Sequence, residues 1–124
     1  MSGKYLIMPD QDHGGSWDFT PEQLDQALHG NWPHARLVGP IPRFNVYTLS
    51  VPYRDELREF SYFDDRKFFS FSDQDPIDFP FRVVFTLLIA LAPKQQVMWT
   101  DDFGGDVHYA DLSAGIHQLL RPFQ

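Results

Sequence analysis

The side chains that could do chemistry are concentrated in one short segment, VMWTDDFGGDVHYADLS at residues 97–113. Carboxylate oxygens together with an imidazole nitrogen can bind a divalent cation or transfer a proton. Carboxylates beside aromatic rings can instead form a surface that a basic partner recognises. A third interpretation is a polar turn, because Gly104 and Gly105 allow positive φ angles. Eleven positions hold all the titratable residues concerned, which are Asp101, Asp102, Asp106, His108 and Asp111.

The metal interpretation would use Asp101, Asp102, Asp106 and His108 as ligands. Their order does not follow the calcium-binding EF-hand loop, which needs the pattern D-x-[DN]-x-[DN]-G and a later Glu. In a strand over residues 107–110, His108 and Tyr109 would also point to opposite faces. We therefore expect a turn with no bound metal or cofactor, and the alternative function is a small metal-dependent or acid–base enzyme that uses this 101–108 cluster.

The binding interpretation joins this segment to a second group of aspartates. Residues 73–111 hold seven aspartates against Arg82 and Lys94, in a chain whose formal charge is −7. The aspartates would attract the Lys and Arg side chains of a partner, while the aromatic rings would fill a pocket in it. Whether Trp99 faces the core or the partner stays open. The expected partner-binding residues are Asp73, Asp75, Asp101, Asp102, Asp106, Trp99, Phe103 and Tyr109.

Two further places could contribute to function. His13, in the loop DQDHGGSWD, could form an acid–base couple with Asp12 or Asp18, although a plain glycine-rich loop is the simpler interpretation. Phe68 and Phe69 are adjacent, so in a strand they must point to opposite faces. We expect Phe68 to be the exposed one and a second candidate for an interface.

The pattern of apolar residues predicts the strands that must position these side chains. Alternation is clearest in NVYTLSV, and EFSYFDDRKFFSFS reads as a hairpin around the polar turn DDRK. Other strands are expected at KYLIMP, ARLVGPI, QQVMWTDD and VHYADL. We predict a single α+β domain over residues 1–124, with a mainly antiparallel sheet of about five to six strands packed by three helices.

Three helices are expected from their capping residues and apolar spacing. TPEQLDQALHGNW begins with Thr20 as the N-cap, and Gln23 completes a capping box. The apolar stretch FPFRVVFTLLIALAP follows Asp78, a plausible N-cap, and ends at Pro93. SAGIHQLLRPF forms the last helix, with Ser113 as its cap.

Composition excludes several classes of function. The 124-residue chain has no cysteine, which excludes disulfides, thiolate metal sites and a cysteine nucleophile. It shows no basic patch, so we do not expect nucleic-acid binding. Its longest apolar stretch is interrupted by Arg82 and Thr86 and is too short for a membrane span. We expect a cytoplasmic protein that does not bind membranes.

Three stretches carry a resemblance to a known group of proteins: KYLIMPD, TPEQLDQALHGNWPHA and WTDDFGGDVHYADLSAGI. In these stretches the chain resembles small bacterial proteins, some of which are immunity proteins of bacterial toxin systems. The resemblance assigns no functional residue. It implies a protein-binding module without enzymatic activity, which would neutralise a basic toxin by binding it.

Overall fold

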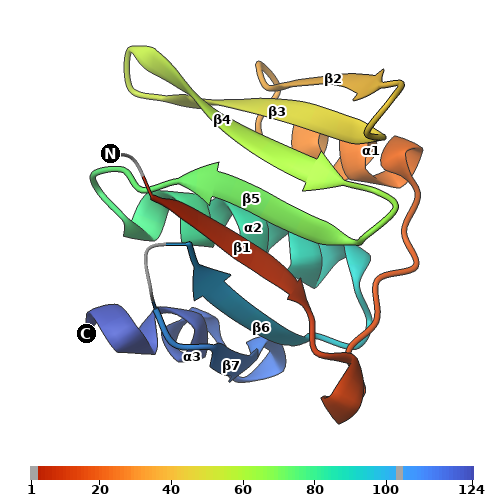
Figure 1. The fold of residues 1–124 in the computed structure, drawn as a ribbon. Coiled ribbons are helices and arrows are strands. Elements are labelled where there is room, and N and C mark those ends of the chain that lie inside the picture. The colour runs from red at the N-terminus through yellow and green to blue at the C-terminus, as the bar shows by residue number, and fades with distance from the viewer. Residues whose placement is uncertain (1–2, 103–104) are drawn as a thin grey trace.

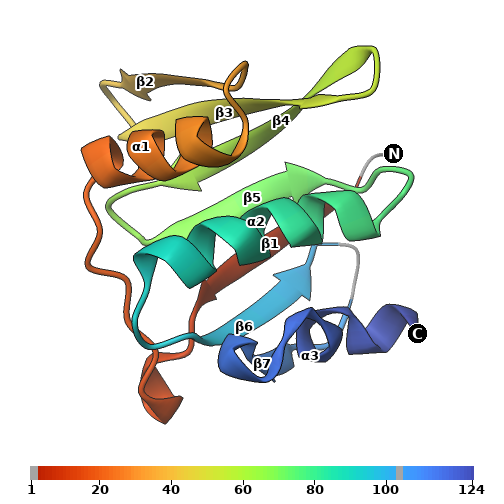
Figure 2. The same ribbon diagram turned by 180° about the vertical axis from the view of Figure 1, so that it is seen from behind.

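In the part of the chain that the structure describes, seven antiparallel strands form one sheet, and three α-helices pack against a single face of it (Figures 1 and 2). The computed structural model describes residues 3–102 and 105–124. The sheet has the strand order β2-β3-β4-β5-β1-β6-β7. Its strands are β1 (Lys4–Pro9), β2 (Arg36–Ile41), β3 (Val46–Tyr53), β4 (Glu56–Phe63), β5 (Phe68–Ser72), β6 (Gln96–Asp101) and β7 (His108–Asp111).

The predicted α+β class is confirmed, but the sheet has more strands than the five to six predicted from the sequence. The four-residue strand β7 pairs along its whole length with β6, and the mostly exposed β2 pairs with β3. Both edge strands were expected from the sequence, at VHYADL and ARLVGPI, so every strand of the sheet corresponds to a predicted segment and only the predicted total was too low.

The strand β1 lies in the middle of the sheet, between β5 and β6. Its residue Ile7 is opposite Phe69 on one side and Trp99 on the other, and all three side chains are buried on the face that the helices cover. The neighbouring residues of β1, Leu6 and Met8, point to the other face, because side chains alternate along a strand.

The first helix, α1 (Pro21–Asn31), begins as predicted. The side chain of Thr20 accepts a hydrogen bond from the backbone N–H of Gln23, and the Gln23 side chain accepts one from the backbone N–H of Thr20. This reciprocal capping box satisfies two backbone donors that the first helical turn would otherwise leave free. Leu24 and Leu28 then face the core.

The starts of the other two helices differ from the prediction. The helix α2 (Asp78–Leu91) has Ile77 in the cap position, and Asp78 is already helical, where it accepts a hydrogen bond from Arg82 one turn later. The helix α3 (Ile116–Leu120) begins after Gly115. Ser113 does not cap it, because Ser113 lies in a short 3₁₀ turn, Leu112–Ala114, and donates to Asp111.

The lengths and sequences of the helices show whether any of them could span a membrane. None of the helices within the described part of the chain is long and apolar enough to cross a bilayer. The most apolar of them, α2, instead buries one side on the sheet through Phe81, Val84 and Leu88.

Candidate functional site

Two of the acidic segments predicted from the sequence meet at one end of the sheet, where β5 and β6 finish and β1 starts. The backbone N–H of Asp73 donates to the carbonyl of Gly3, and that of Asp102 donates to the carbonyl of Lys4. Because β1 separates β5 from β6, the two segments are two strand spacings apart, about 10 Å. We call Asp73, Asp101 and Asp102 the acidic end.

The carboxylates of the acidic end also have structural partners. Oδ1 of Asp102 accepts the backbone N–H of Lys4 at 2.7 Å, and Oδ1 of Asp101 accepts that of Gly105 at 2.7 Å. Burial raises the pKa of Tyr5, and the negative charges of Asp73 and Asp101 raise it further. The carboxylates of Asp73 and Asp101 therefore both influence the phenol of Tyr5, which indicates that the two acidic segments form one region.

The remaining acidic candidates lie elsewhere. Asp75 is exposed, and its backbone carbonyl accepts a hydrogen bond from Arg58 of β4 at 3.1 Å, so it belongs to the β4 side of the molecule. Asp106 is exposed in the segment before β7. Asp111 pairs with Gln96 at the opposite end of β6, about 17 Å of strand away from Asp101. Phe103 lies outside the described residues.

Trp99 is a core residue. Its side chain is 2% exposed. Its ring packs edge-to-face on Phe81 at 4.9 Å and stacks on Phe123 at 5.6 Å between ring centroids. The alternative that the sequence left open is thus decided in favour of the core, and Trp99 is not available to fill a pocket in a partner.

The residues that follow in β7 alternate as the sequence predicted. His108 packs on the indole ring of Trp99 at 4.3 Å, on the face that the helices cover. Tyr109 points to the other face and is 60% exposed. Within residues 3–102 and 105–124, no group of three His, Asp or Glu side chains is arranged to hold a metal ion. The 101–108 cluster therefore lacks a ligand set among the residues described.

The face of the sheet away from the helices, which we call the open face, carries a line of apolar side chains that crosses the strands. Met8 is opposite Met98, and Met98 is opposite Tyr109. On the other side, continuing the register of β1 and β5 by one residue places Met8 beside Phe68. Residues opposite one another in a sheet point to the same face. We call the full set the apolar row: Ile41, Val46, Phe63, Phe68, Met8, Met98 and Tyr109.

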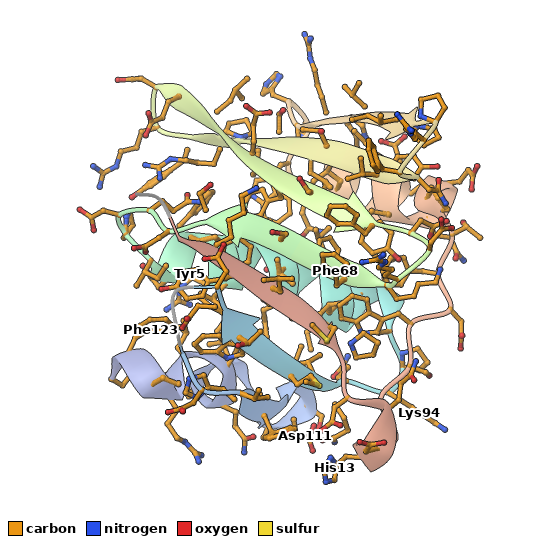
Figure 3. All side chains as sticks on the ribbon, viewed as in Figure 1. Tyr5, His13, Phe68, Lys94, Asp111 and Phe123 are labelled. Carbon is orange, nitrogen blue, oxygen red and sulfur yellow. The ribbon has the colours of Figure 1, made fainter. Side chains whose placement is uncertain are left out.

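The sequence predicted two members of this row, Tyr109 and Phe68. The neighbour of Phe68, Phe69, is fully buried, whereas Phe68 is half-buried and stacks on Phe63 at 4.4 Å between ring centroids. Figure 3 shows Phe68 on the side of the sheet that faces the viewer, with the helices behind. The other members were missed because each comes from a different strand. Only the register between strands brings them into line.

A second arrangement that the sequence did not identify is a buried aspartate that holds an exposed histidine. Nδ1 of His13 is 2.6 Å from Oδ2 of Asp10, and the Asp10 side chain is 5% exposed while that of His13 is 66% exposed. The sequence suggested Asp12 or Asp18 as the partner, which was wrong. The intervening residues form a 3₁₀ turn, Gln11–His13, and this turn places residues three apart on the same side.

The backbone around Asp10 is tightly fixed. Its N–H donates to the carbonyl of Gln96 at 2.8 Å, and its carbonyl accepts the N–H of Gly15 at 2.8 Å. A Cβ at Gly15 would collide with the carbonyl of Gln96 and the backbone of Asp10, so the chain can turn back here only with glycine. The glycines of the DQDHGG loop thus hold the Asp10–His13 pair against the start of β6.

Comparison of the chain with protein-family models, with curated protein sequences and with solved structures gave no match.

Proposed function

We propose that this chain is a protein-binding module without enzymatic activity that binds a basic protein through the open face of its sheet. The apolar row is the observation that carries this proposal. Antiparallel sheets commonly leave one face in contact with water, and that face is then mostly polar. Here a line of Phe, Met and Tyr side chains crosses the strands on a face that no described helix covers (Figure 1).

Charge supports a basic partner. The chain has a formal charge of −7, and the acidic end lies at the ends of the central strands of the same sheet. Asp102 follows Met98 and Thr100 at alternate positions, so it is the member of the acidic end on the side of the open face. From Met98 to Asp102 the chain advances about 14 Å, and one partner of ordinary interface size can contact both the apolar row and Asp102. Apolar contacts would then supply most of the affinity, and the aspartates would increase the rate of encounter.

The nature of the partner follows from the resemblance to immunity proteins. A bacterial toxin that acts on an anionic substrate needs basic residues in its cleft, and an acidic protein that covers this cleft would inhibit it. We therefore propose a basic toxin as the partner, encoded beside this chain in its genome. Among the described residues, Tyr109 and Phe68 of the apolar row are aromatic residues expected from the sequence that remain available for this contact.

The test is binding of the purified product of the adjacent gene, measured by titration calorimetry with wild-type protein and two variants. Met98→Gln replaces a thioether in the apolar row by a polar group of similar size, and Thr100→Gln places the same amide at the next position on this strand and face, outside the row. We expect Met98→Gln to weaken binding about tenfold or more, and Thr100→Gln to have a much smaller effect. Equal affinities for both variants, or no binding by the wild type, would contradict the proposal.

A further inference from the structure

A hollow of about 540 Å³ lies at the end of the sheet opposite the acidic end, next to Tyr109 of the apolar row. It is bordered by the 3₁₀ turn Gln11–His13, by the start of β6, by β7 and by α3. Figure 3 shows His13 and Asp111 on this border. No lysine or arginine is among the described residues that line it. Its polar and aromatic lining consists of Asp10, His13, Gln96, Tyr109, Asp111 and Gln118.

Asp111 gives this hollow a fixed negative charge. Hydrogen bonds from the side chain and backbone of Ser113 and from the side chain of Gln96 hold the pKa of Asp111 below its usual value. The backbone N–H of Asp111 also donates to Oε1 of Gln118 at 3.1 Å, which fixes the residue against α3. A carboxylate offers about four acceptor positions. The Asp111 carboxylate accepts three hydrogen bonds, two from Ser113 and one from Gln96, so it can still accept a hydrogen bond from a ligand.

The aromatic wall of the hollow is fixed as well. The His13 ring meets the Tyr109 ring edge-to-face at 5.8 Å between centroids. His13 cannot swing freely, because its Nδ1 is bonded to the buried carboxylate of Asp10. The Asp10–His13 pair therefore holds the exposed ring of Tyr109 in place beside the ionised carboxylate of Asp111. A ring face next to a carboxylate is the environment that an arginine side chain prefers, since guanidinium both stacks on aromatic rings and pairs with carboxylates.

We propose that this hollow binds the guanidinium group of an arginine from the protein partner, with Asp111 as the pairing carboxylate and Tyr109 as the stacking ring. This inference rests on the proposed function and names one contact of that interface. An anionic ligand would meet the charge of Asp111 with no lysine or arginine among the described lining residues to offset it. A neutral ligand would leave that charge without a counterpart.

The first experiment uses the chain alone. N-acetyl-arginine amide is titrated into ¹⁵N-labelled protein, and the backbone amide signals of Tyr109, Asp111 and Gln118 are followed by NMR. N-acetyl-citrulline amide, which has nearly the same shape but no charge, is the matched ligand. We expect saturable shifts with the arginine amide and no comparable response to the citrulline amide. Equal responses to the two ligands, or no response at these three residues, would overturn the inference.

Variants then separate the hollow from the rest of the interface. Asp111→Asn keeps the oxygen that accepts from Ser113 and removes the charge, so affinity for the arginine amide should fall about tenfold or more, as for loss of a charged hydrogen bond. Asp55→Asn makes the same change of charge at an exposed residue outside the hollow and should leave affinity unchanged. If Asp111→Asn also leaves it unchanged, Asp111 is not the pairing group and the inference fails.

The same variants distinguish failure of this inference from failure of the proposed function. A partner that loses affinity with Met98→Gln but not with Asp111→Asn would leave the proposed function standing and overturn the arginine contact. Binding of arginine amide in the hollow, with no binding of a basic protein, would show that the hollow takes a free cation. It would contradict both the partner contact and the proposed function.

Discussion

Trp99 and Tyr109 lie on neighbouring strands, but their side chains are on opposite faces of the sheet: Trp99 is 2% exposed and Tyr109 is 60% exposed. The pairing of β6 with β7 produces this separation, because it places Trp99 opposite His108 and Tyr109 opposite Met98. One face supports the core and the other is available for binding. Two aromatic residues that are close in sequence and similar in type therefore have different environments.

Replacement of Trp99 by alanine should destabilise the domain strongly. The side chain packs among Tyr5, Phe81 and Phe123, and its loss leaves a cavity that these rings cannot fill. We expect the free energy of unfolding to fall by about 3–5 kcal/mol, measured by urea denaturation. Tyr109→Ala is the control and should change it by less than about 1 kcal/mol. Similar losses for the two variants would mean that Tyr109 is packed as tightly as Trp99.

Neutralising the acidic end should slow association with a basic partner. The variant Asp73→Asn, Asp101→Asn, Asp102→Asn keeps the side-chain oxygens that accept from Gly105 and Lys4, so the domain should remain folded. Measured by stopped-flow, the association rate at low salt should drop about tenfold and depend less on salt. A control with equal loss of charge uses Asp18, Glu22 and Asp55, which are exposed elsewhere. If both triple variants slow association equally, the association rate depends on the net charge of the protein and not on the position of the acidic end, which would contradict this prediction.

Whether Asp73 and Asp101 both lie close to Tyr5 can be tested without a binding partner. The charges of Asp73 and Asp101 raise the pKa of Tyr5, because they oppose formation of the phenolate. Asp73→Asn together with Asp101→Asn should therefore lower the pKa of Tyr5, although burial, the larger cause, will keep it above the usual value. NMR titration of the Tyr5 ring signals measures this change. An unchanged pKa would mean that the two carboxylates are too far from Tyr5 to influence its ionisation.

Removal of the capping box should destabilise α1. Thr20→Ala deletes the oxygen that accepts the backbone N–H of Gln23, and this loss should lower the free energy of unfolding by about 1 kcal/mol. Thermal melting with circular dichroism is sufficient to measure the effect. Thr20→Ser retains the hydroxyl and should melt close to the wild type. A serine variant as unstable as the alanine variant would show that the threonine methyl group matters more than the cap.

Local features of the sequence predicted local features of the fold. The capping box of α1, the β4–β5 hairpin and the opposite directions of Phe68 and Phe69 all depend on residues within a few positions of one another, and all three are confirmed. Local reasoning failed at Ser113. There a hydrogen bond to Asp111 competes with the predicted helix cap, and propensity alone cannot decide between two such partners.

The candidate site was predicted only in part, because it depends on register. The meeting of Asp73 with Asp101 and Asp102 was expected from the sequence, and so was the strand β1, but the position of β1 between β5 and β6 was not. The apolar row needs Met8, Phe68 and Met98 to lie opposite one another on three strands, and no single segment contains that information. The Asp10–His13 pair was missed because its geometry comes from a 3₁₀ turn, which has no strong sequence pattern.

The central position of β1 has a consequence for the way the chain folds. Its residue Ile7 pairs with Phe69 and Trp99, so β1, which leaves the ribosome before the other strands of this sheet, finds its neighbours only after these later segments have been made. Until then, the apolar strand has no partner and is open to aggregation or to capture by a chaperone. Long-range pairing of this kind also slows folding. Completion of the sheet must therefore wait for the arrival of β6, and a ribosome stalled before residue 96 would hold a nascent chain without a closed core.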